Sequence, residues 1–233
     1  MINGKNILVV YSSKNVEGRR DGQYFTKMAK QFAQHHGVPE ENMLGIECPG
    51  VPNSIRYGKL CRFIDGKRNI KQIAMFCHGY STGMQFGLSK KNAPCFAEVL
   101  KKSCTKDLKI TLYACSTAST SKNTRKISMP GTDNGYADTL RDSMLMQGFK
   151  GGWIDAHLTP GDTVYNPFVI RFYTEPAFEK EWDLPGGEWL VSPKSVLWKK
   201  WKRCLQNTKS NFRFRFTQYT EEQLYEFLKG LGR

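Results

Sequence analysis

Short hydrophobic segments alternate with amphipathic ones along the first three quarters of this chain. Apolar runs predict strands at residues 5–11, 43–46, 70–77, 108–114 and 151–156. Apolar positions spaced three and four residues apart predict helices from about residue 25 to Gly37 and at 55–64, 92–104 and 138–147. Strands separated by helices of this length predict an α/β fold with a doubly wound, mostly parallel sheet flanked by helices.

The pattern changes after residue 175. Residues 176–233 hold four of the five tryptophans, the alternating strand pattern "FRFRF" at 212–216 and a last amphipathic segment. The sequence therefore predicts a sheet domain at 1–175 and an aromatic-rich C-terminal accessory segment at 176–233 that packs on it.

The net charge of +14 is concentrated in the first 130 residues, which hold 21 Lys and Arg against 8 Asp and Glu, a net of +13. A basic surface favours acidic partners, nucleic acid included. The segment "LWKKWKRC" at 197–204 interleaves Trp with Lys and Arg, a composition able to stack on bases and neutralise phosphates. Its aromatic residues share one helical face, so packing against the protein is favoured over nucleic-acid binding.

Seven cysteines without a CxxC pair do not resemble a structural zinc site. Neither a secretory signal nor an apolar run of membrane-spanning length is visible, so we expect a cytoplasmic protein without membrane insertion or a disulfide framework. Most of the thiols are expected to behave as small hydrophobic core residues.

Two predicted strands end in reactive side chains. "IAMFCHG" carries His78 followed by Gly79, and "ITLYAC" ends in Cys115, 37 residues after His78. One strand–helix–strand crossover separates them, so both side chains should emerge at the same edge of a parallel sheet. There a thiolate can attack a carbonyl while an imidazole accepts and returns the proton. The backbone N–H groups of Gly79 and Cys115 are the expected oxyanion donors.

A hydrophobic strand ending in His-Gly, followed by one ending in Ala-Cys, resembles the caspase-like cysteine peptidases. The resemblance covers about residues 5–173, and the segment from Val9 to Met43 is similar to the opening of metacaspase-like domains. It implies a protein or peptide substrate, Cys115 as nucleophile, His78 as base, and peptide-bond hydrolysis without a required metal or redox cofactor. The run Tyr113-Ala114-Cys115-Ser116-Thr117 and the short His–Cys gap depart from true caspases, so the match is to the wider metacaspase- and clostripain-like group.

Substrate-binding candidates come from two loops. Asp155, His157 and Asp162 are expected to follow the next strand and to border the cleft, where Asp155 or Asp162 would select Lys or Arg before the cleaved bond. Arg19 and Arg20 in the first loop support the opposite preference, because they could clamp an acidic side chain.

Two further interpretations stay open. A caspase-like fold with this dyad can serve as an inactive scaffold that binds peptides or regulates an assembly. The opening "KNILVVYSSKN" also resembles flavodoxin-like proteins, but its loop lacks their compact glycine spacing and leaves His78 and Cys115 without a role.

Overall fold

The computed structural model describes residues 2–14, 23–119, 135–157, 169–175 and 178–183. Its main sheet contains seven strands in this described part. They are Ile7–Lys14 (β1), Met43–Glu47 (β2), Ile70–Phe76 (β3), Cys104–Tyr113 (β7), Trp153–His157 (β8), Val169–Glu175 (β9) and Phe178–Asp183 (β10).

The order across the sheet is β10-β9-β8-β7-β3-β1-β2. Strands β2, β1, β3, β7 and β8 are mutually parallel. β9 pairs antiparallel with β8, and β10 pairs antiparallel with β9. The prediction of an α/β fold with a mostly parallel sheet is thereby confirmed. β10 also extends this sheet past residue 175, where the sequence placed the end of the sheet domain.

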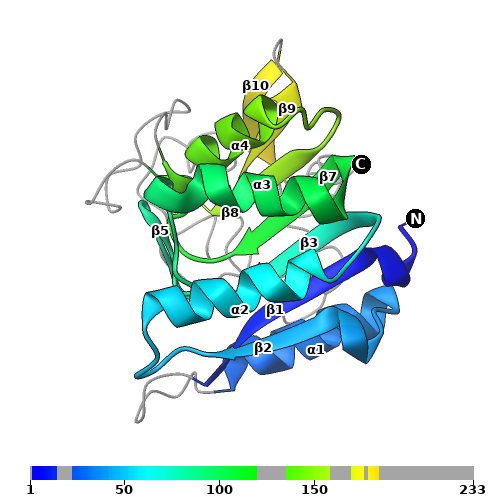
Figure 1. The fold of residues 1–233 in the computed structure, drawn as a ribbon, viewed down its shortest axis with the longest axis vertical. Coiled ribbons are helices and arrows are strands. Elements are labelled where there is room, and N and C mark those ends of the chain that lie inside the picture. Colours follow the sequence, from blue (N-terminus) through cyan, green and yellow to red (C-terminus); the bar gives the residue numbers. More distant parts are fainter. Residues whose placement is uncertain (1, 15–22, 120–134, 158–168, 176–177, 184–233) are drawn as a thin grey trace, which may run out of the picture.

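Four helices cover the sheet in the described residues (Figure 1). They are Tyr24–His36 (α1), Asn53–Asp65 (α2), Ala93–Ser103 (α3) and Tyr136–Met146 (α4). Helix α1 packs on β1 and β3, and its apolar stripe shares a cluster with Ile7, Val9 and Phe76. The other three helices lie side by side over the opposite face, which holds the larger hydrophobic cluster.

The sequence explains where α1 forms and ends. Phe25, Met28, Ala29, Phe32 and Ala33 are buried at three- and four-residue spacing, so one face of the helix enters the core. Gly37 adopts a left-handed conformation, with φ 63°, and its N–H donates to the carbonyls of the last turn. A glycine accepts this conformation without steric cost, so the helix stops there.

A smaller three-stranded sheet lies just beyond β3. It consists of Gly79–Tyr80 (β4), Gly83–Met84 (β5) and Leu88–Ser89 (β6), paired antiparallel in that order. Within the described ranges, short 3-10 helices occupy Gly4–Asn6 (η1), Glu40–Asn42 (η2) and Lys90–Asn92 (η3). Strand β4 starts directly after His78.

Two strands extend well beyond their predicted boundaries. β1 continues to Lys14, through residues expected in the first loop, because it pairs with β2 as far as Glu47. β7 begins at Cys104, four residues earlier than expected, because its first residue pairs with Ile70 of β3. Among the described helices, none combines the length and apolar character needed to cross a membrane.

Candidate active site

His78 and Cys115 follow the carboxyl ends of two neighbouring parallel strands. Phe76 of β3 pairs with Tyr113 of β7, and the Cys77 N–H donates to the Tyr113 carbonyl at 3.3 Å. His78 and Cys115 each lie two residues beyond this pair. Since paired strands run about 4.8 Å apart, both residues follow neighbouring strands at the same edge of the sheet.

Gly79 packs directly against the loop that carries Cys115. A Cβ atom placed on Gly79 would lie 2.7 Å from the Cys115 carbonyl oxygen, 2.7 Å from Thr117 Cγ2 and 2.8 Å from Ala114 Cβ. Real side chains do not approach backbone this closely, so only glycine fits here. The absence of a side chain therefore allows the segment after His78 and the segment after Tyr113 to touch.

The N–H of Gly79 points away from β5. Gly79 pairs with Met84, and the Gln85 N–H donates to the His78 carbonyl at 3.0 Å. This bond flanks the Gly79–Met84 pair, which is therefore of the non-hydrogen-bonded kind. In such a pair the N–H and C=O groups face outward, so the Gly79 N–H is oriented toward the outer edge of β4.

A tight turn holds the segment after Cys115. Ser116 has a φ of 55°, a left-handed conformation that costs a non-glycine residue about 1–2 kcal/mol. The Thr117 hydroxyl donates to the Ala114 carbonyl at 3.1 Å, and the Ala118 N–H donates to the His157 carbonyl at 2.9 Å. The turn is thus bound to the end of β8. It keeps Cys115 just beyond the carboxyl end of β7, where the residue is partly exposed.

The N-terminus of α4 braces both loops. Its Ala137 N–H donates to the Thr117 carbonyl and its Tyr136 N–H donates to the Ser81 carbonyl, each at 3.0 Å. One end of a helix therefore holds both the Cys115 turn and the hairpin that follows His78. N-terminal helical N–H groups lack intrahelical partners, which makes them suited to this contact.

Two contacts orient His78, which is half-buried. Its ring lies edge-on against Phe25 of α1, with ring centroids 5.1 Å apart and planes at 87°. The backbone N–H of His78 donates to Gln85 Oε1 at 3.3 Å, which fixes the main chain at this residue, and Arg56 of α2 in turn donates to the Gln85 carbonyl. Phe25 and Gln85 were not predicted as site residues, and Gln85 carries no sequence signal because its contact depends on the hairpin geometry.

The other described thiols differ from Cys115 in their surroundings. Cys77 is fully buried, and this burial raises the pKa of its thiol well above the ordinary value. Burial also raises the pKa of Cys104 to about 12. Cys95, on α3, is exposed. The expectation that most thiols are small core residues holds for Cys48 and Cys77, which lie in the larger hydrophobic cluster. Cys61 and Cys104 are only partly buried against that cluster.

Asp155 differs from its expected position. It lies inside β8, buried, instead of in a loop after the strand. Arg171 of β9 binds it through two contacts, Nε to Oδ1 at 2.8 Å and Nη2 to Oδ2 at 3.2 Å, and Trp153 Nε1 donates to Oδ2 at 3.1 Å. Because this arginine neutralises the carboxylate, Asp155 does not present a free negative charge to a basic substrate side chain.

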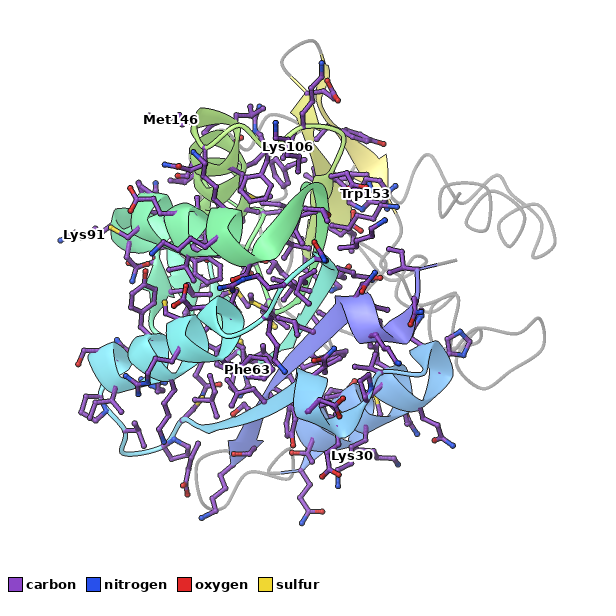
Figure 2. All side chains as sticks on the ribbon, turned by 45° about the vertical axis from the view of Figure 1, so that its right-hand side comes forward. Lys30, Phe63, Lys91, Lys106, Met146 and Trp153 are labelled. Atoms are coloured by element: carbon purple, nitrogen blue, oxygen red, sulfur yellow. The ribbon has the colours of Figure 1, made fainter. Side chains whose placement is uncertain are left out.

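Trp153 completes this polar cluster. Lys109 Nζ lies 4.0 Å and Arg171 Cζ 4.2 Å from its ring centroid, both suited to cation–π attraction. The side chains of this cluster come from β7, β8 and β9. Trp153 is on the side of the molecule away from α3 (Figure 2). Arg171 was missed at the sequence level because it belongs to a strand that was not predicted.

His157 is the last residue of β8 and is buried. Its backbone pairs with Val169 and accepts the hydrogen bond from Ala118 described above. It therefore shares the sheet edge with His78 and Cys115, and it supports the Cys115 turn through its main chain.

Several predicted site residues lie outside the described residues. These are Arg19, Arg20, Asp162 and the basic aromatic segment 197–204. Among the described residues, no three His, Cys, Asp or Glu side chains are grouped closely enough to hold a metal ion. No protein-family model matches the chain, and a search of curated proteins finds no match either.

Proposed function

We propose that this chain is a cysteine endopeptidase of the caspase-like type, with Cys115 as nucleophile and His78 as general base. The observation that carries the proposal is the pairing of Phe76 with Tyr113, which sets both residues two positions beyond neighbouring parallel strands. The direct contact between Gly79 and the Cys115 carbonyl supports it further. Strand ends of this kind are where open α/β sheets bind their ligands.

The reaction needs no group beyond these side chains and water. His78 accepts the proton of the Cys115 thiol, and the thiolate attacks the scissile carbonyl carbon. The tetrahedral intermediate collapses, the C–N bond breaks, and His78 gives its proton to the leaving amine. Water, deprotonated by His78, then attacks the thioester, so that the carboxylic acid is released and the Cys115 thiol is regenerated.

The oxyanion of each intermediate would be held by backbone donors. The Gly79 N–H is suited to this because it points away from β5, and the Cys115 N–H is the second donor that we assign. Donors fixed in a turn and a hairpin require little rearrangement when negative charge develops. Removal of one such donor typically slows an enzyme about 100- to 1000-fold.

The pairing of Asp155 with Arg171 changes the expected cleavage preference. A preference for Lys or Arg before the cleaved bond would have to come from Asp162, because the Asp155 carboxylate is already bound. The proposal does not include caspase-type cleavage after Asp, since the residue before the Ala-Cys pair is Tyr113.

A peptide-library digest tests the proposed function. The wild type should cleave a defined set of peptides, and Cys115→Ala should abolish that cleavage. Cys95→Ala, which removes an exposed thiol on α3, is the matched control and should keep full activity. Peptide binding without cleavage in the wild type would instead support the inactive scaffold.

A further inference from the structure

Gln85 contacts both polar main-chain groups of His78. Its side-chain Oε1 accepts from the His78 N–H at 3.3 Å, and its own N–H donates to the His78 carbonyl at 3.0 Å. One residue of the hairpin therefore holds the main chain on both sides of the His78 Cα atom. The positions of these main-chain atoms set the direction of the Cα–Cβ bond, and so the direction in which the imidazole leaves the backbone.

Gln85 is itself held from helix α2. The Arg56 guanidinium donates through Nη1 to the Gln85 carbonyl and through Nη2 to Asn53 Oδ1, near the start of this helix. Hydrogen bonds from a charged donor are stronger than those between neutral groups, and the planar guanidinium fixes their direction. The main chain of Gln85 is thus anchored to α2.

The bend that follows Gln85 packs directly on α2. Gly87 has a φ of 77°, and a Cβ atom placed on it would lie 2.1 Å from the Asn53 carbonyl oxygen. Its N–H donates to the Met84 carbonyl at 3.2 Å, which closes the bend. Because only glycine permits this approach, the segment that carries Gln85 has little room to shift relative to the helix.

We infer that Gln85, anchored by Arg56, is a positioning residue for His78. This inference rests on the proposed peptidase function. Gln85 holds the main chain of His78, while Phe25 contacts its ring. The base and the nucleophile must meet in a narrow range of geometry, and a displacement of about 1 Å can slow an enzyme about 100-fold.

Gln85→Met tests the inference because it keeps the length of the side chain and removes its oxygen acceptor. Peptide cleavage should show a kcat at least about 10-fold lower with little change in KM, because His78 is displaced and the substrate contacts are not. Gln85→Glu keeps an acceptor and should restore most of the rate. Gln31→Met on α1 is the matched control, since Gln31 Oε1 has no hydrogen-bond partner within the part of the chain that the structure describes, and it should leave kcat unchanged.

Amide hydrogen exchange, measured by NMR, separates positioning from a general loss of stability. The His78 N–H should exchange faster in Gln85→Met than in the wild type and in Gln85→Glu, because its acceptor is removed. The N–H groups of β3 should keep their wild-type exchange rates. Faster exchange throughout β3 would show that the substitution destabilises the whole fold, and it would overturn the positioning role.

The inference and the proposed function fail in different ways. Cys115 of the wild type should react with a peptidyl ketone, and Gln85→Met should slow that reaction as it slows cleavage. An unchanged Cys115 rate, or an unchanged exchange rate of the His78 N–H, in Gln85→Met would overturn the role of Gln85 alone. No reaction at Cys115 in the wild type would overturn the proposed function and this inference together.

Discussion

At Gly79, a single hydrogen atom takes the place of a side chain at the contact between the two proposed catalytic loops. A methyl group there would meet the Cys115 carbonyl oxygen at 2.7 Å, which requires the loops to separate. The next unusual residue, Ser116, holds a left-handed φ directly after Cys115, the proposed nucleophile. Strained backbone of this kind persists where surrounding contacts fix it, and it often accompanies function.

Gly79→Ala should slow modification of Cys115 by a peptidyl ketone at least about 10-fold, because displaced oxyanion donors lose more than that. Gly58→Ala is the matched control. Gly58 lies inside α2, where an added Cβ meets Arg62 Nη1 at 3.5 Å, an ordinary contact. That variant should keep the rate and gain up to about 1 kcal/mol of helix stability. An unchanged rate in Gly79→Ala would contradict the proposed contact.

The common sheet edge of His78 and Cys115 was predictable at the residue scale, and the contacts around these two residues were not. The short spacing of His78 and Cys115 by one crossover predicted a shared sheet edge, because parallel neighbours follow from right-handed crossovers. The contacts of Phe25 and Gln85 with His78 depend on a helix and a hairpin that meet only in the folded chain. No local pattern in the sequence encodes such contacts.

At the scale of elements, β9 is a strand that the sequence prediction missed. The run Val169–Glu175 has the β-branched and aromatic composition of a strand, so its existence could have been predicted. Its antiparallel direction could not, since hydrophobic periodicity is the same for both directions. This direction brings Arg171 opposite Asp155 and turns a candidate pocket residue into half of a buried ion pair.

Asp155→Asn should destabilise the fold by about 3 kcal/mol, because it leaves the buried Arg171 charge without its partner. Urea unfolding at neutral pH measures this. Glu47→Gln is the control, since Glu47 forms an exposed ion pair with Lys14, and it should leave the unfolding midpoint nearly unchanged. Normal stability of Asp155→Asn combined with a lost preference for Lys or Arg would show that Asp155 is a pocket residue after all.

His36, at the end of helix α1, should make the free energy of unfolding depend on pH. Burial, with a smaller effect from the charge of His35, lowers the pKa of His36 from 6.5 to about 4. The unfolded chain therefore binds a proton first as the pH falls below 6.5, and stability present above that pH is lost toward pH 4. After halving for partial exposure, the expected loss is about 1 kcal/mol at pH 5.

Urea unfolding of the wild type and of His36→Gln at pH 7.5 and pH 5.0 measures how much the free energy of unfolding changes between the two pH values. The variant should lose about 1 kcal/mol less than the wild type between the two pH values. His35→Gln is the control and should behave nearly as the wild type, because burial is the larger cause of the shift. An equal loss in all three proteins would contradict the assignment to His36.

At the scale of the whole molecule, two hydrophobic clusters share one sheet. The cluster under α1 and the cluster under α2, α3 and α4 lie on opposite faces of the same strands. The continuous apolar runs within β1 and β3 indicate burial on both faces, because parallel sheets are covered on both sides. Which helix covers which face follows from the crossovers and was not assigned from the sequence.

A shared sheet predicts one cooperative unfolding transition for both clusters. Phe32→Ala under α1 and Phe96→Ala under α3 should each destabilise by about 3–5 kcal/mol, since both side chains are fully buried. Each variant should shift the far-UV circular dichroism and tryptophan fluorescence curves together. Separate transitions, with each variant shifting only one of them, would contradict a single cooperative unit.

The most direct test of the proposed dyad is the rate at which a peptidyl ketone modifies each cysteine, mapped by mass spectrometry. At neutral pH, Cys115 should react at least about 10-fold faster than the exposed Cys95 of α3, because an adjacent base activates a thiol. His78→Ala should lower the Cys115 rate to that of Cys95 and leave the Cys95 rate unchanged. Preferential reaction at Cys95 in the wild type, or an unchanged Cys115 rate in His78→Ala, would contradict the account.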